Sequence, residues 1–125
     1  MARFTNQVAL ISGGADGLGK GIAALIASEG GKVVLLDSNP SKLEQTESEF
    51  NLAGYQVMTI VADVTSEDSI VSAYEEVGKK YGQIHIMVNC AGIVGPTSTK
   101  ITDYSTEDFD RLYQVNQRGT FLMTK

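Results

Sequence analysis

Three glycines are placed where a chain could bind phosphate. Gly13, Gly17 and Gly19 have the spacing G-x-x-x-G-x-G, between an apolar run at residues 8–11 and an apolar-periodic segment at residues 18–29. The run is typical of a strand and the segment of a helix. Glycine allows positive φ and close approach to the backbone, and a helix N-terminus offers unpaired N–H groups to an anion. Phosphate binding is therefore favoured over a glycine-rich loop without a ligand, and the expected contacts are Gly13, Asp16, Gly17, Leu18 and Gly19.

An aspartate ends the second apolar run, Lys32 to Asp37. A carboxylate at Asp37 can accept both ribose hydroxyls of an adenosine, and it repels a 2′-phosphate. Asp16 adds a second negative charge nearby, and Ser38 is not basic. The alternative is a solvated turn aspartate that helps to cap the following helix. We prefer the ribose role, so the expected cofactor is NAD, with NADP less favoured.

A second aspartate, Asp63, follows the third run, Gln56 to Val61. Its carboxylate could accept a hydrogen bond from the exocyclic amine of adenine, with Val64 packed on the ring. A turn or capping role before Thr65 is an equally good interpretation of Asp63 taken alone.

Small residues follow the fourth run, residues 84–89, which ends in Asn89. Ala91 and Gly92 let the backbone pass close to a ligand, and the Asn89 side chain can tie neighbouring loops together. We therefore expect Asn89, Ala91 and Gly92 to contact the cofactor. His85, in the apolar run, has no partner at metal-ligand spacing, and Cys90 has no assigned base, so neither is taken as a ligand or nucleophile, and no metal site is predicted.

Strand-like and helix-like segments alternate throughout the chain, which predicts one α/β domain over residues 1–125 with a doubly wound parallel sheet. The expected strand order is 3-2-1-4, with a ligand beyond the carboxyl ends of the strands. Leu18, Ile22, Leu25 and Ile26 are expected to form the buried face of the first helix. The predicted strands are residues 8–11, 32–37, 56–61 and 84–89; helices cover 18–29, 39–54, 65–82 and a segment from about Ser105, after a loop at 90–104.

Together these motifs resemble the amino-terminal half of a short-chain dehydrogenase/reductase, which has a Rossmann-type fold. The family's T-G-x-x-x-G-x-G corresponds to residues 12–19, its strand-two aspartate to Asp37 and its adenine-pocket D-V to Asp63 and Val64. Its N-N-A-G corresponds to residues 89–92, with cysteine replacing the second asparagine. The resemblance covers the whole chain.

The family also has an asparagine in the helix after the fourth strand, and this asparagine corresponds to Asn116. The periodicity places it with Phe109, Leu112, Tyr113 and Thr120 on the expected inward stripe of the last helix. A polar residue there needs hydrogen-bond partners, so one interpretation is a satisfied core asparagine. The resemblance implies instead a catalytic Asn116, which holds a water of a proton relay in a kinked helix.

The resemblance also implies hydride transfer between the nicotinamide of NAD and an alcohol or carbonyl substrate. The family's Tyr-x-x-x-Lys is absent from these 125 residues. We therefore expect a cofactor-binding half that is inactive alone, incomplete without a catalytic half, and part of a homo-oligomer (tetramer or dimer) when full length. Stopping at strand four would leave that strand as an exposed edge, so the isolated piece is expected to aggregate, or to be ordered only by a partner or by the rest of a longer polypeptide.

Composition excludes several other classes. A net charge of −5 argues against nucleic-acid and anionic-membrane partners, and no apolar run has the length of a membrane span. One cysteine cannot form a disulfide framework, so a cytoplasmic location is expected. Two alternatives are a non-catalytic nucleotide-binding module with the same fold and a methyltransferase. The glycine spacing and residues 89–92 argue against the methyltransferase.

Overall fold

The computed structural model describes residues 2–125, in which four parallel strands form one sheet in the order β3-β2-β1-β4. The strands are β1 (Val8–Ser12), β2 (Lys32–Asp37), β3 (Gln56–Val61) and β4 (Ile86–Asn89). β1 is central, since it pairs with β2 on one side and with β4 on the other. The predicted α/β fold and strand order are confirmed.

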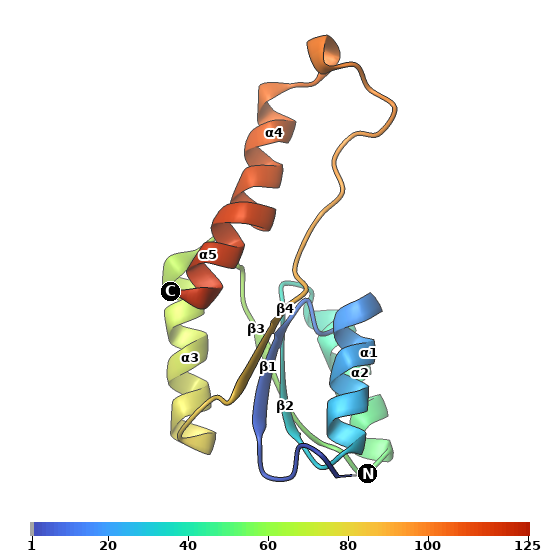
Figure 1. The fold of residues 1–125 in the computed structure, drawn as a ribbon, viewed down its shortest axis with the longest axis vertical. Helices are drawn as coiled ribbons and strands as arrows, with labels where there is room; N and C mark the ends of the chain where they lie inside the picture. The colour runs from blue at the N-terminus through green and yellow to red at the C-terminus, as the bar shows by residue number, and fades with distance from the viewer. Residues whose placement is uncertain (1) are drawn as a thin grey trace.

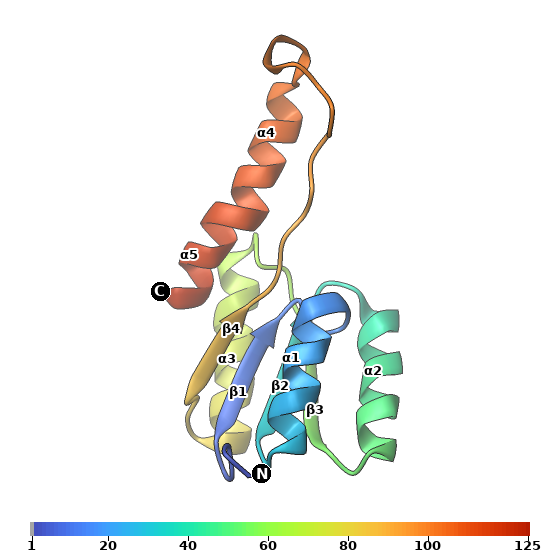
Figure 2. The same cartoon turned by 45° about the vertical axis from the view of Figure 1, so that its right-hand side comes forward.

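Helices cover both faces of the sheet (Figure 1). α1 and α2 lie on one face, and α3 and α5 lie on the other, while α4 extends beyond the end of the sheet in both views (Figures 1 and 2). The helices are α1 (Gly17–Ser28), α2 (Pro40–Leu52), α3 (Glu67–Tyr81), the 3-10 turn η1 (Ile101–Asp103), α4 (Thr106–Leu112), the π-helix η2 (Tyr113–Arg118) and α5 (Gly119–Thr124).

The hydrophobic core has two parts because the sheet is covered on both faces. Alternate residues of β1 contribute to each: Val8 and Leu10 pack towards α3 and α5, and Ala9 and Ile11 pack towards α1 and α2. The apolar residues 33–36 of β2 are almost fully buried. The continuous apolar run of β2 is thus a strand buried on both faces, as expected for a parallel sheet.

The predicted buried face of α1 was wrong at two positions. Leu18 is 82% exposed and Leu25 is 56% exposed. The buried residues of α1 are Gly19, Ala23, Ile26 and Ala27. Small residues let this helix lie close to the sheet. Which residues of α1 are buried therefore depends on side-chain size as well as on hydrophobicity.

The expected inward stripe of the last helix was also wrong in part. Phe109, Tyr113 and Asn116 are exposed, whereas Leu112 and Thr120 are half-buried. The reason is that α4 projects past the sheet, so that only the far end of this helical segment, at Leu122 and Met123, is buried in the core (Figure 2).

β4 begins at Ile86, two residues later than predicted, and it forms one edge of the described sheet. His85 lies just before it, where its Nδ1 accepts a hydrogen bond of 2.9 Å from the Val8 N–H. The imidazole therefore helps to join the start of β1 to this edge. Among residues 2–125, no helix combines the length and apolar composition needed to cross a membrane.

Candidate functional site

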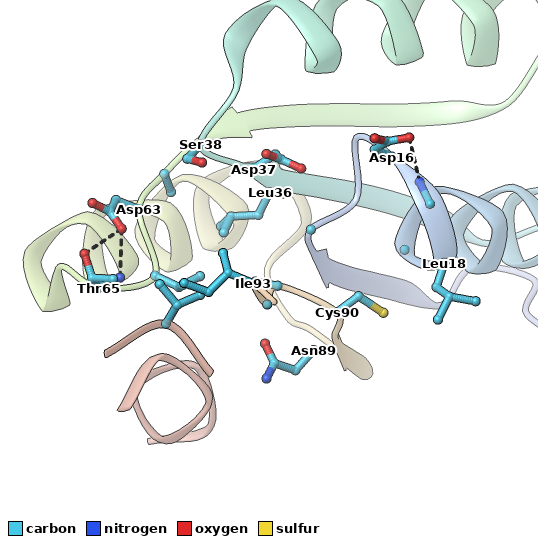
Figure 3. Close-up of a pocket in the computed structure, with 18 of the residues that line it drawn as sticks. Asp16, Leu18, Leu36, Asp37, Ser38, Asp63, Thr65, Asn89, Cys90 and Ile93 are labelled. Carbon is cyan, nitrogen blue, oxygen red and sulfur yellow. Dashed lines mark hydrogen bonds between the residues drawn. The ribbon is translucent and has the colours of Figure 1, made fainter. Parts of the chain in front are cut away.

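A cleft of about 870 Å³ lies at the carboxyl ends of the strands, where each strand passes into a loop. Its walls come from the glycine turn, the ends of β2, β3 and β4, and α4 with η2. Figure 3 shows the carboxylates of Asp37 and Asp63 on one wall and Cys90 and Leu18 on another. Every residue that the sequence assigns to the cofactor lines this cleft: Gly13, Asp16, Gly17, Leu18, Gly19, Asp37, Asp63, Val64, Asn89, Ala91 and Gly92.

The three glycines of the turn have different roles. A Cβ at Gly13, where φ is +66°, would lie 2.8 Å from the backbone carbon of Cys90, and a Cβ at Gly19 would overlap the carbonyl oxygen of Gly13. These two glycines thus allow the turn to pack against itself and against the end of β4. Gly17 has a φ of +54°, which favours glycine, and an added Cβ there would have no neighbour within 4 Å, so the space at the start of α1 is open.

The N-terminus of α1 presents free donors to the cleft. Asp16 caps the helix, since its Oδ1 accepts from the Gly17 N–H at 2.8 Å, and the Lys20 N–H donates to the Asp16 carbonyl. Within the described chain, no protein acceptor is bonded to the N–H groups of Leu18 and Gly19, which belong to the unsatisfied first turn of a helix. An anion in the cleft would find these donors and the positive end of the helix dipole.

Asp16 also forms an ion pair with a lysine of α2. Its Oδ2 lies 2.9 Å from the Nζ of Lys42 on α2. The hydrogen bond from Lys42 lowers the pKa of Asp16, and the same contact raises the pKa of Lys42. The charge of Asp16, which the sequence suggested would add to that of Asp37, is therefore compensated.

Asp37 joins β2 to the glycine turn. Its Oδ2 accepts from the Ala15 N–H at 3.3 Å, and its Oδ1 accepts from the Asn39 N–H at 3.1 Å. Asn39 itself caps α2 by accepting from the Lys42 N–H. Asp37 is half-buried and lines the cleft, so its side chain both supports the turn and borders the cleft.

Asp63 takes part in a tight local turn. Its Oδ1 accepts from the backbone N–H of Thr65 at 2.9 Å and from the Thr65 hydroxyl at 2.7 Å (Figure 3). These bonds hold the pKa of Asp63 below its usual range, with the hydroxyl as the larger cause. The turn role is thus present, and Asp63 and Val64 still line the cleft.

Asn89 ties three elements together, as its type and position suggested. The Ser12 hydroxyl of β1 donates to its Oδ1 at 2.6 Å, and its Nδ2 donates to the Thr120 hydroxyl of α5 at 2.5 Å. The Ser12 oxygen in turn accepts from the N–H groups of Cys90 and Ala91 at 3.2 Å. The backbone at the end of β4 is thereby fixed beside the glycine turn.

Asn116 does not line the cleft, although it holds a segment that does. Its Oδ1 accepts from the Ile93 N–H and its Nδ2 donates to the Ile93 carbonyl, both at 2.9 Å. Both polar ends of the side chain are thus occupied by backbone. Asn116 lies within the π-helix η2, so the helix is irregular at this point.

The sequence did not assign several further lining residues to the ligand: Leu36, Ser38, Ala62, Thr65, Cys90, Ile93, Arg111, Gln114 and Val115. Arg111, Gln114 and Val115 are spaced as i, i+3 and i+4, which places them on one helix face. That spacing is a signal in the sequence, but only the fold shows that this face meets the cleft.

The model of the short chain dehydrogenase family matches residues 7–125. The chain belongs to the short-chain dehydrogenases. The match covers nearly the whole chain and includes every residue of the cleft. The family consists of oxidoreductases that use nicotinamide cofactors.

Similar proteins support the assignment to this family of dehydrogenases. The chain is 34% identical over its whole length to an uncharacterised oxidoreductase, YxbG, of Bacillus subtilis (strain 168), covering 45% of it. It is 36% identical over 92% of its length to a diacetyl reductase ((S)-acetoin forming) of Staphylococcus epidermidis, covering 44% of that enzyme. A structure of an NAD⁺-bound xylitol dehydrogenase matches 98% of the chain with a TM-score of 0.93 and 31% identity, over 46% of that protein. The chain spans about half the length of the curated relatives it matches.

Proposed function

We propose that this chain forms the cofactor-binding half of an NAD-dependent oxidoreductase. The observation that carries the proposal is the cleft, in which a glycine turn with free helix N–H donors faces the carboxylate of Asp37. The donors suit the phosphates of a dinucleotide, and the carboxylate suits an unmodified adenosine ribose.

The residues present fit such a cofactor. Gly17 leaves open space at the N-terminus of α1, so a phosphate can approach the N–H groups of Leu18 and Gly19. Asp37 would accept from the ribose hydroxyls, and Val64 with the free oxygen of Asp63 would contact the adenine. Asn89, Ala91 and Gly92 would border the nicotinamide end, where Asn89 holds the backbone through Ser12.

The bound cofactor supplies hydride transfer to or from a small-molecule alcohol or carbonyl substrate. This chain's residues bind and orient the cofactor, and Asn116 holds the Ile93 backbone beside the cleft. We propose that the proton relay implied for Asn116 operates only together with a Tyr-x-x-x-Lys, which residues 1–125 do not contain. The chain alone is therefore expected to bind cofactor without turnover, and the whole protein is expected to be a homo-oligomer.

The Asp37→Ala variant tests the ribose assignment. Its affinity for NAD should fall while its affinity for NADP rises, because the variant loses the acceptor for the ribose hydroxyls and the charge that repels a 2′-phosphate. Glu76→Ala is the matched control, since Glu76 is an exposed carboxylate of α3 that does not line the cleft. An unchanged ratio of the two dissociation constants in Asp37→Ala would refute the role of Asp37.

A further inference from the structure

We propose that Arg118 is a positioning residue for the adenosine half of the cofactor. The structure links this arginine of η2 to residues 63–65, which form one wall of the cleft. The inference rests on the proposed function, because it assigns the adenosine to that wall.

The first link is a chain of hydrogen bonds. The Nη1 of Arg118 donates to the carbonyl of Thr65 at 2.9 Å in a partly buried contact. The N–H and hydroxyl of Thr65 donate to the carboxylate of Asp63, at 2.9 and 2.7 Å. The guanidinium therefore holds the residue that orients the Asp63 carboxylate.

The second link is a close backbone approach directly after Arg118. A Cβ added at Gly119 would lie 3.0 Å from the Cγ2 of Val64, which is tighter than ordinary contact. Val64 is buried and lines the cleft. The helical segment of Arg118 and Gly119 thus supports this wall in two ways, by the guanidinium hydrogen bond to Thr65 and by the packing of Gly119 against Val64.

Few other hydrogen bonds hold this wall. In the described chain, the remaining hydrogen bonds of residues 63–65 are local: the Asp63 N–H donates to the Ser69 hydroxyl at 3.0 Å, and the Ser66 N–H donates to the Asp63 carbonyl at 3.0 Å. These bonds hold the turn to the start of α3 but not to η2 or α5. Without Arg118 the turn keeps its internal shape and the packing of Val64 at Gly119, and it loses the hydrogen bond that joins Thr65 to η2.

A second cation on the same helical segment provides a matched control. The Nζ of Lys125 lies 2.8 Å from Glu67 Oε2, so this pair also joins the last helix to α3. The pair is exposed, and neither residue lines the cleft. Lys125→Met therefore removes a contact between the end of this helical segment and the start of α3 without touching residues 63–65.

The experiment measures the binding of ADP by titration calorimetry to the purified protein and to Arg118→Met, Arg118→Gln and Lys125→Met. ADP is the probe because it carries the adenosine and two phosphates without nicotinamide. Arg118→Gln keeps a polar side chain that is too short to reach Thr65, so it remains informative where the methionine variant does not fold. Arg118→Lys tests rescue by a side chain that keeps the charge and most of the length.

Arg118→Met and Arg118→Gln should each bind ADP about fivefold or more weakly than the parent protein, a loss of roughly 1 kcal/mol of binding free energy. Lys125→Met should bind ADP as the parent protein does, and Arg118→Lys should recover part of the loss. Equal ADP affinity in Arg118→Gln and the parent protein would overturn the inference, as would an equal loss in Lys125→Met. Failure of the parent protein to bind ADP or NAD would instead overturn the proposed function.

Discussion

Asp16 and Lys42 form an ion pair of 2.9 Å that joins the N-terminus of α1 to α2. Asp16 and Asp37 both line the cleft, so the charge of this part of the cleft depends on whether Asp16 is paired. Because Lys42 compensates Asp16, the proposed function assigns the discrimination against NADP to Asp37. The sequence contains both charges but does not show that they meet.

Neutralising Asp16 is expected to favour NADP. In Asp16→Asn the ammonium of Lys42 loses its partner and becomes available to a 2′-phosphate, so NADP affinity should rise by about two- to fivefold, the scale of an exposed ion pair. The measurement is a pair of titrations with NADP and NAD. Adding Lys42→Met to this variant should abolish the gain, and a gain that survives the second substitution would contradict the role of Lys42.

A side chain at Gly19 is expected to disrupt the turn. The added Cβ of Gly19→Ala would overlap the carbonyl oxygen of Gly13, so the variant should lose about 1–3 kcal/mol of unfolding free energy, as in other overpacked sites. Gly21→Ala is the control in the same helix, because nothing lies within 4 Å of its added Cβ. It should gain roughly 0.5–1 kcal/mol from helix propensity. Urea unfolding measures both, and equal stability of the two variants would contradict this account.

The hydroxyl of Thr65 is expected to control the titration of Asp63. Thr65→Val removes the larger of the causes that lower the pKa of Asp63, so that pKa should rise towards its ordinary value. Since a lowered folded-state pKa contributes stability above the unfolded-state pKa, that contribution is lost as the pH falls through the folded-state value. In the variant the contribution should be smaller. A carboxyl NMR titration measures the shift, and an unchanged pKa would rule out the hydroxyl as its cause.

The bond between Asn89 and Thr120 is expected to hold the end of β4 to α5. Thr120→Val keeps the shape of the side chain but leaves the Asn89 Nδ2 without its acceptor, which should cost about 1–3 kcal/mol of unfolding free energy. Thr124→Val is the control, because the Thr124 hydroxyl donates only to carbonyls of its own helix. Denaturant unfolding measures the free energy of unfolding of both variants. Equal losses in the two variants would show that the bond to Asn89 adds no stability.

The sequence could predict those parts of the fold and site that depend on local order. The carboxyl ends of parallel strands meet at one edge, so Gly13, Asp37, Asp63 and Asn89 could be assigned to one cleft from their positions after apolar runs. The first three helices followed from apolar periodicity, and the structure has them at Gly17–Ser28, Pro40–Leu52 and Glu67–Tyr81.

The rest depends on where helices come to lie, which local patterns do not contain. Leu18 has the hydrophobicity of a core residue, yet it is exposed, and the buried residues of α1 are a glycine, two alanines and Ile26. Likewise, the bond of Arg118 with Thr65 spans 53 residues and that of Asn89 with Thr120 spans 31. Such pairs follow from the path of α4, η2 and α5, which runs from beyond the sheet back onto the face that α3 covers (Figure 2), and no spacing in the sequence indicates them.

The central claim is that this cleft binds NAD through the glycine turn and Asp37. The most direct test is calorimetric titration of the unmodified protein with NAD and with NADP under identical conditions. The account predicts binding of NAD with an affinity about tenfold or more above that of NADP, a difference of roughly 1.4 kcal/mol. Equal affinities for the two would contradict the role of Asp37, and no binding of either would contradict the assignment of the cleft.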